Sequence, residues 1–159
     1  MNMIKYVYLN KKGVTNMPYA VDLFCGAGGC SEGLIQAGFH ILFSSDISDM
    51  VELTYTHRHE QLGLIQGKNT WFERSDIRDL TGNDIRKYIT NLEIFKGKEM
   101  PEIDLMIGGP SCQAFHVQDA EINLIPAICF LENMYEWLMK LNPNILFSKM
   151  LKVLLTCNL

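Results

Sequence analysis

The sequence has no run of about 18 apolar residues, the length that a membrane-spanning helix needs. Its first residues, MNMIKYVYLNKKG, also lack the apolar stretch of a secretory signal peptide. A basic excess is missing too: the net charge is −4, whereas phosphate neutralisation gives stand-alone DNA-binding proteins much of their affinity. We therefore expect a cytoplasmic (or nuclear) protein that is not secreted and has no membrane partner. If the protein works on DNA, much of its affinity for DNA must come from elsewhere than this chain.

The five cysteines include no Cys-x-x-Cys pair, which favours free thiols in a reducing compartment over a standard zinc site. A zinc site built from Cys25, Cys30 and the His57/His59 pair is an alternative, but its spacing fits no standard pattern, and we expect no metal. Cysteines most often behave as small buried hydrophobic residues. That is the prediction for four of the five, namely Cys25, Cys30, Cys129 and Cys157.

Short apolar runs alternate with segments of helical spacing, and 159 residues suit one domain. This alternation predicts an α/β fold with a doubly wound parallel sheet. Residues 1–18 are expected to form an N-terminal arm, either a hairpin or a frayed segment. The expected strands are 20–24, 40–47, a third reaching Asp76, 103–110 and 144–148; the expected helices are 31–37, capped by Gly38, then 49–59, 83–94 and 124–141.

The first expected strand runs into a glycine-rich segment, FCGAGGCSEG, that precedes a helix. Gly26, Gly28 and Gly29 allow a tight turn and a close approach of backbone to ligand. The helix N-terminus after them offers free N–H groups to a ligand carboxylate. The dinucleotide pattern GxGxxG fails from either starting glycine, so the alternative of an ordinary tight βα turn stays open.

Two aspartates follow later strands of the predicted sheet. Asp46 ends the second strand, 20 positions after Gly26, where doubly wound folds present a carboxylate to ribose hydroxyls. Asp76 ends the third strand and can accept a hydrogen bond from an adenine amino group, while Ile47 and Ile77 offer apolar faces. Both aspartates can alternatively be strand-end or helix-capping residues.

A second glycine turn, GGPSCQAFH, follows the strand that begins near Ile103. Its two glycines and proline predict a rigid turn that holds the Cys112 sulfur at the ligand edge of the sheet, with Gln113 and Phe115 nearby. A nucleophilic cysteine needs thiolate character, and no lysine or arginine is close to Cys112 in sequence.

Together the two loops resemble the cytosine-5 DNA methyltransferase family. DLFCGAGGCSEGLIQAGF resembles its first motif and GGPSCQAF its Pro-Cys-Gln nucleophile motif, with SSDIS and SDIRDL between them like the second and third motifs. The resemblance covers about residues 18–149 and implies a Rossmann-like S-adenosylmethionine-dependent methyltransferase fold. Ser111 and His116 depart from the family's usual proline and serine.

The resemblance also implies roles for individual residues. Asp46 would bind the ribose of S-adenosylmethionine, Ile47 would lie against its adenine, and Asp76 and Ile77 would contact the adenine. Cys112 would attack C6 of a cytosine flipped out of double-stranded DNA, supported by Gln113 and Phe115. The remaining residues of the implied cofactor pocket are Phe24, Gly26, Ala27, Gly28, Gly29 and Pro110.

The family's Glu-Asn-Val tripeptide, whose glutamate binds the cytosine ring, is missing where it is expected. Lys149, Met150 and Leu151 occupy its place, and Glu132-Asn133-Met134 lies mid-helix, too close to Cys112. One choice of codons for residues 148–153 encodes Glu-Asn-Val-Lys-Gly when it is read in a shifted frame. We therefore expect a methyltransferase subdomain over 19–148, an out-of-frame tail over 149–159, and no target-recognition domain.

This incompleteness predicts weak stability, weak cofactor binding and little activity of the chain by itself, because the last strand would be an unpaired apolar edge. One alternative is a non-catalytic remnant, or a half-subunit that needs a separately encoded C-terminal part. A tRNA cytosine-5 methyltransferase relative shares the same loops. An unrelated nucleotide-binding oxidoreductase is disfavoured by the failed GxGxxG pattern and by the Cys112 loop.

Overall fold

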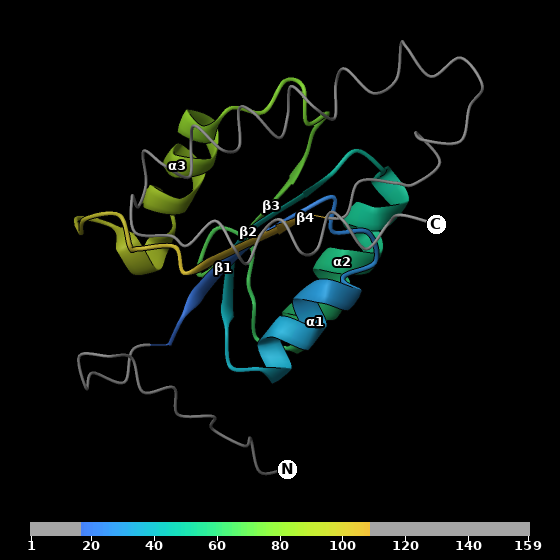
Figure 1. Ribbon diagram of the computed structural model, residues 1–159, viewed down its shortest axis with the longest axis horizontal. Helices are drawn as coiled ribbons and strands as arrows, with labels where there is room; N and C mark the ends of the chain where they lie inside the picture. The colour runs from blue at the N-terminus through green and yellow to red at the C-terminus, as the bar shows by residue number, and fades with distance from the viewer. Residues whose placement is uncertain (1–16, 109–159) are drawn as a thin grey trace, which may run out of the picture.

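A computed structural model of the chain describes residues 17–108, which form a parallel four-stranded sheet with helices on both faces (Figure 1). The strand order is β3-β2-β1-β4, and every pairing is parallel. The predicted α/β class with a parallel sheet is therefore confirmed. The elements are β1 (Tyr19–Leu23), α1 (Gly29–Gln36), β2 (His40–Asp46), α2 (Asp49–Gln61), β3 (Trp71–Arg74), α3 (Gly82–Thr90), the 3-10 helix η1 (Glu93–Phe95) and β4 (Leu105–Gly108).

The sheet is buried on both sides, as its continuous apolar strands require. In Figure 1, α1 and α2 cover one face and α3 covers the other. Val21, Leu23 and Phe43 lie in the core on the α3 side, whereas Ala20 and Ile41 belong to a cluster with residues of α1. In β1 neighbouring residues thus enter opposite layers, which is the expected period of two. In β2 the register shifts between the pairs Ala20–Ile41 and Val21–Phe43, so Leu42 is an extra residue and the alternation is interrupted there.

The helices begin and end where the sequence offers capping groups. The Ser48 side chain accepts a hydrogen bond from the Val51 backbone N–H at the start of α2, and Thr81 forms a capping box with Asp84 at the start of α3. Gly38 has a φ of 90° after α1, and the Phe39 N–H donates to the Leu34 carbonyl at 2.9 Å. The predicted glycine cap of the first helix is confirmed as a Schellman-type ending.

The predicted end of the third helix was wrong. The helix expected over 83–94 stops at Thr90, and a short 3-10 helix follows. The backbone N–H groups of Glu93 and Ile94 donate instead to the carbonyls of Gly67 and Lys68, each at 3.1 Å. These long-range bonds replace the continuation of α3.

The third strand also ends earlier than expected, at Arg74 rather than Asp76. The Ser75 N–H still donates to the Asp46 carbonyl at 3.1 Å, so the chain stays beside β2 for one more residue. Asp76 then turns the chain, because its carboxylate accepts from the Arg78 N–H at 2.9 Å and its carbonyl accepts from the Asp79 N–H at 3.0 Å.

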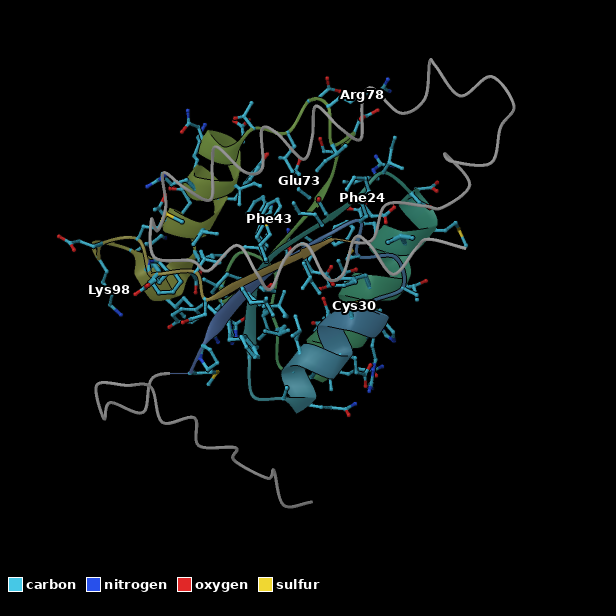
Figure 2. The ribbon with its side chains drawn as sticks, in the orientation of Figure 1. Phe24, Cys30, Phe43, Glu73, Arg78 and Lys98 are labelled. Carbon is cyan, nitrogen blue, oxygen red and sulfur yellow. The ribbon has the colours of Figure 1, made fainter. Side chains whose placement is uncertain are left out.

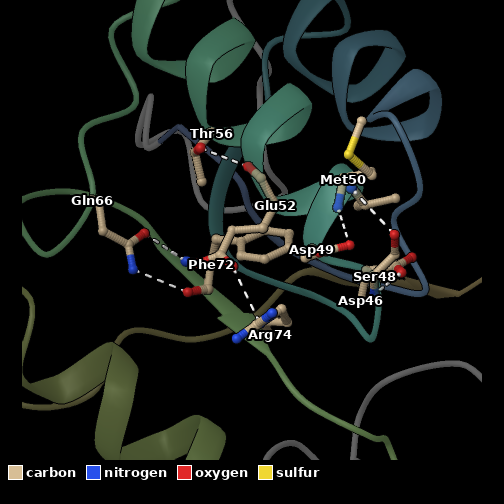
Figure 3. A network of polar contacts seen from close by, with 10 residues as sticks. Asp46, Ser48, Asp49, Met50, Glu52, Thr56, Gln66, Phe72 and Arg74 are labelled. Atoms are coloured by element: carbon tan, nitrogen blue, oxygen red, sulfur yellow. Dashed lines mark hydrogen bonds and ion pairs between the residues drawn. The ribbon is translucent and has the colours of Figure 1, made fainter.

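Among the described strands, β3 lies at the sheet edge opposite β4, and a side-chain amide occupies part of its outer side (Figure 3). Gln66 accepts from the Phe72 N–H at 2.7 Å and donates to the Phe72 carbonyl at 3.0 Å. These are the two backbone groups through which another strand would pair, so Gln66 protects the edge.

The order of the strands creates a switch point beside β1. The chain moves outward from β1 through β2 to β3, and then returns to add β4 on the other side of β1. In open α/β sheets the ligand crevice forms beyond the carboxyl ends of the strands at such a point. Here the point lies between the carboxyl ends of β1 and β4.

Several predictions fall outside the described residues. They are the expected strand 144–148 and helix 124–141, the burial of Cys129 and Cys157, the arm over 1–18 apart from its last two residues, and the site residues Pro110, Cys112, Gln113 and Phe115. Over 17–108, no helix is both long and apolar enough to cross a membrane.

Candidate functional site

The loop after β1 is a tight turn made of left-handed backbone. Phe24 has a φ of 56°, Gly26 of 51° and Gly28 of 92°. The Gly28 N–H donates to the Cys25 carbonyl at 3.0 Å, and the Cys25 N–H donates to the Ser45 carbonyl of β2 at 3.1 Å. Only glycine adopts such angles readily, so two of the predicted glycines are required by the backbone. Phe24, predicted as the end of the strand, lies instead in this turn.

One side of this loop is packed and the other is open. A Cβ atom added to Gly28 would lie 2.6 Å from the His59 Cε1 atom and 3.1 Å from the Tyr55 ring of α2. Added to Gly26 or Gly29, it would meet no described atom within 4 Å. The loop therefore rests on α2 through Gly28 and leaves the backbone of Gly26 and Gly29 accessible on its other side.

The open side includes the beginning of α1. Gly28 is the N-cap residue, and no side chain in the described part of the chain caps it. The first turn thus keeps backbone N–H groups and the positive end of the helix dipole for a ligand. The acidic residue of that turn, Glu32, is held by an ion pair with Arg58 of α2. Figure 2 shows Phe24 beyond the end of β1 and Cys30 in the first turn of α1.

Asp46 joins the end of β2 to this loop. One carboxylate oxygen accepts from the Gly26 N–H at 3.1 Å, and the other accepts from the Ser48 N–H at 3.0 Å. Each oxygen has a further lone pair, and the half-buried carboxylate lies at the carboxyl edge of the sheet. The next residue, Ile47, leaves 67% of its surface exposed beside the loop. The structure therefore joins Asp46 to Gly26 and leaves Ile47 exposed next to Asp46, while their contacts with a ligand stay predictions.

Asp76 lies beyond β3 and is already engaged. The Arg78 guanidinium donates to both of its carboxylate oxygens, at 2.5 to 3.0 Å. Those bonds lower the pKa of Asp76 to about 2. Ile77 packs against the core on the α3 side of the sheet. Asp76 acts here as the capping residue of its own turn, and its contact with adenine stays a prediction.

A buried chain of hydroxyl groups lies beneath the loop, and sequence reasoning missed it. Ser31 donates to the Asp22 carboxylate at 2.5 Å, and its oxygen lies 2.7 Å from the Tyr55 hydroxyl. That hydroxyl lies 2.6 Å from the Ser44 hydroxyl. The chain joins β1, α1, α2 and β2. Its only signal in the sequence was an aspartate inside the apolar run AVDLF.

Burial dominates the electrostatics of this polar chain. It raises the pKa of Asp22 to about 6, although the Ser31 hydrogen bonds oppose the shift. Burial also raises the pKa of Tyr55 above its usual range, so its hydroxyl stays protonated. Asp22 therefore carries a proton-sensitive charge inside a network of neutral hydroxyl groups.

The two described cysteines differ. Cys25 is buried, as expected, and burial raises the pKa of its thiol, which disfavours the thiolate form that a nucleophile needs. Cys30 is exposed, so the prediction that it is buried was wrong. The helix begins at Gly29, two residues earlier than expected, and this places Cys30 in an open first turn. No group of three or more potential metal-ligating side chains occurs within residues 17–108.

The second glycine turn begins directly beside the first. Gly108, the last residue of β4, pairs with Leu23, the last residue of β1. A Cβ on Gly108 would lie 3.3 Å from the Leu23 carbonyl oxygen and 3.7 Å from a ring carbon of Phe24. The close pairing thus favours glycine at this position. Residues 109–116, with Cys112, lie outside the described part.

Comparison with known proteins gives the family. The model of C-5 cytosine-specific DNA methylases matches residues 19–121, which is more than half of the chain. Among curated relatives, the Type II methyltransferase M.AgeI of Thalassovita gelatinovora is 33% identical over 95 residues, covering 60% of this chain and 19% of that protein. M1.HphI of Haemophilus parahaemolyticus is 32% identical over 95 residues, with 60% and 21% covered. The chain thus spans about a fifth of the length of these relatives.

A solved structure agrees in fold. A protein encoded within an E. coli prophage and assigned as a DNA modification methyltransferase matches with a TM-score of 0.50 and 22% identity. The match covers 73% of this chain and 29% of that one. Such a likeness supports the Rossmann-like methyltransferase fold. On the family match over 19–121, the chain belongs to the C-5 cytosine-specific DNA methylases.

Proposed function

We propose that this chain supplies the S-adenosylmethionine cradle and the cysteine nucleophile of a DNA (cytosine-5-)-methyltransferase. One observation carries the proposal. The loop after β1 and the turn after β4 start from paired residues, Leu23 and Gly108, at the switch point of the sheet. A donor bound in the first loop and a thiol four residues beyond Gly108 then meet at one edge.

The described residues fit the donor. The open backbone at Gly26 and Gly29 and the uncapped start of α1 suit its methionine carboxylate. The free lone pairs of Asp46 suit the ribose hydroxyls, and the exposed face of Ile47 suits the adenine ring. Phe24, Ala27, Asp76, Ile77 and Pro110 complete the proposed pocket. When bound, S-adenosylmethionine supplies an electrophilic methyl group.

Cys112 is proposed to carry the covalent step. Its thiolate adds to C6 of a flipped cytosine, and the π electrons of the C5–C6 double bond move to C5, which becomes nucleophilic. After C5 takes the methyl group, a base removes the C5 proton. The electrons of that bond restore the double bond and expel the Cys112 thiolate. Gln113 and Phe115 are proposed to support the loop that holds the sulfur.

Double-stranded DNA is the proposed substrate, because the family acts on it. The net charge of −4 leaves the chain without a basic excess, so we propose that another polypeptide segment supplies most of the affinity for DNA. We propose a separately encoded C-terminal part that carries a recognition domain as the source of that affinity. An adjacent reading frame that encodes such a part would support this.

The tail over 149–159 is proposed to be out of frame, which makes 19–148 the methyltransferase subdomain. The nucleotide sequence of the gene tests this directly. Codons for residues 148–153 that do not encode Glu-Asn-Val in a shifted frame would rule the frameshift out.

The donor site is tested by saturation-transfer NMR with S-adenosylhomocysteine, which detects weak as well as tight binding. We expect signal transfer to the adenine and ribose protons with the unchanged chain. Asp46→Ala should abolish it, because that change removes both the ribose acceptor and the bond to Gly26. Asp79→Ala, an exposed carboxylate outside the loop, is the matched control and should leave the transfer unchanged. No transfer with the unchanged chain would contradict the proposed cradle.

The nucleophile is tested by covalent capture of duplex DNA that contains 5-fluorocytosine, in the presence of S-adenosylmethionine and of any C-terminal part encoded beside the gene. Once C5 has taken the methyl group, its fluorine cannot leave as a proton does, so the adduct persists. We expect a band shift that survives denaturation and is lost in Cys112→Ser. A shift retained in that variant would assign the attack to another residue.

A further inference from the structure

We propose that Tyr55 of α2 is a positioning residue for the methyl-donor loop, which we define as Phe24–Gly29. The identity of the ligand rests on the proposed function, whereas the effect of Tyr55 on the position of the loop does not. Tyr55 is buried on the packed side of the loop, where its ring lies 3.1 Å from the position of a Cβ atom on Gly28. It acts through the residues that it holds.

The Tyr55 hydroxyl sits between two elements that flank the loop. It lies 2.7 Å from the Ser31 hydroxyl in the first turn of α1 and 2.6 Å from the Ser44 hydroxyl in β2. Ser31 in turn donates to Asp22 in β1. The Tyr55 hydroxyl therefore ties the beginning of α1 to β2, while Ser31 itself ties it to β1, and all four side chains are almost fully buried.

The Tyr55 ring supports the loop from the same side. It stacks on His59, with ring centroids 3.7 Å apart and planes 12° apart. Both rings meet the space that a Gly28 side chain would fill. His59 is fixed by a 2.8 Å contact between its Nδ1 atom and the Tyr55 carbonyl, and its Nε2 atom has no hydrogen-bond partner among residues 17–108. The ring pair forms the floor on which Gly28 rests.

A role in packing alone would not require the hydroxyl. Phenylalanine has the same ring and would keep the stack on His59 and the floor under Gly28. The hydroxyl, however, forms hydrogen bonds with the hydroxyl groups of Ser31 and Ser44, which are fully buried. Removing one partner of a buried hydrogen bond leaves the other unsatisfied, which costs more than the bond itself contributes. We therefore expect the loss to appear at the start of α1.

The experiment compares the full chain with Tyr55→Phe and with Tyr88→Phe as a matched control. Tyr88 lies on α3, on the other face of the sheet, where its ring stacks on Phe43 and Trp71. Both variants lose one phenolic hydroxyl. Amide hydrogen exchange is followed at Glu32, whose N–H donates to the Gly28 carbonyl at 2.8 Å, and at Gly28 itself.

Tyr55→Phe should lower the protection of these two amides about tenfold, which corresponds to the loss of one buried hydrogen bond. Tyr88→Phe should leave both within about twofold of the unchanged chain, because its hydroxyl is remote from the loop. Equal protection in all three proteins overturns the proposal. An equal loss in both variants overturns it too, since that would reflect general stability. If Tyr55→Phe does not fold, Ser44→Ala replaces it and should lower the same amides.

The second readout is the affinity for S-adenosylhomocysteine, measured by NMR titration on the same three proteins. Tyr55→Phe should weaken binding about tenfold at an unchanged fraction folded, and Tyr88→Phe should leave it unchanged. An unweakened Tyr55→Phe overturns the positioning role. If the unchanged chain does not bind, the proposed donor site fails, and the exchange data alone decide whether Tyr55 positions the loop.

Discussion

Gly28 is the position at which the donor loop is most sensitive to change. The substitution Gly28→Ala adds one methyl group in two unfavourable ways. The backbone φ of 92° lies in the region that L-residues with a side chain rarely adopt. The new Cβ would also lie 2.6 Å from the His59 Cε1 atom, well inside normal contact, and His59 cannot easily move because it is buried against Tyr55.

The two effects can be estimated separately. A left-handed backbone costs alanine about 1–2 kcal/mol relative to glycine. Overpacking a buried contact adds about 1–3 kcal/mol. Gly28→Ala should therefore lower the free energy of unfolding by about 2–5 kcal/mol. Gly63→Ala is the matched control: its φ is 87°, and its Cβ would meet nothing within 4 Å. That variant should lose only the backbone part, about 1–2 kcal/mol.

Urea unfolding followed by circular dichroism measures both variants against the unchanged chain. The midpoint of Gly28→Ala should fall further than that of Gly63→Ala, with a similar slope for all three proteins. Equal losses in the two variants would refute the argument, because the contact between Gly28 and the ring pair would then contribute nothing. A second change, His59→Ala, should recover part of the loss in Gly28→Ala by making room for the methyl group.

Three further predictions concern other parts of the described chain. Gln66→Ala should expose the edge groups of Phe72 and cause concentration-dependent association, seen by size-exclusion chromatography; a monomer at all concentrations would contradict it. The pKa of Asp22 is about 6 in the native state, whereas its ordinary value is 3.8. The contribution of Asp22 to stability is therefore full below about pH 4 and is lost as the pH rises through 6. Relative to Asp22→Asn, the chain should thus lose about 3 kcal/mol over that window, and a constant difference would refute the burial effect. Arg78→Ala should raise the pKa of Asp76 from about 2 toward its ordinary value, measured by carbon NMR of the carboxyl group; an unchanged pKa would assign the shift to another cause.

Over residues 17–108 the sequence was sufficient for the order of the strands and α-helices and for the positions of Gly26 and Asp46 at the carboxyl edge of the sheet. β1 and β2 are apolar runs that end at a glycine turn and at Asp46, so hydrophobic pattern and turn chemistry agree there. The glycine after α1 marked the helix end for the same reason. Local sequence signals predict structure well where the local preference and the tertiary contacts favour the same conformation.

Where tertiary bonds compete with local preference, the predictions were wrong. Nothing in residues 83–94 signals that the N–H groups of Glu93 and Ile94 donate to the 67–68 loop, and this is what ends α3. The hydroxyl chain escaped notice for a related reason. Ser31 and Tyr55 are unremarkable in helical segments, and their importance appears only when α1 and α2 pack side by side. The contacts that matter most to the site are therefore those that sequence spacing cannot reveal.

The position of Gly108 next to the methyl-donor loop depends on the register of β1 against β4. Tyr19 and Asp104, which lie 85 residues apart, fix that register at the start of the strands. The Tyr19 N–H donates to the Asp104 carboxylate at 2.8 Å, and the Asp104 N–H donates to the Tyr19 carbonyl at 3.0 Å. A slip of one residue would turn the buried side chain of Met106 to the opposite face of the sheet, so the hydrophobic core fixes the same register. Gly108 must then end opposite Leu23, the residue that precedes the methyl-donor loop.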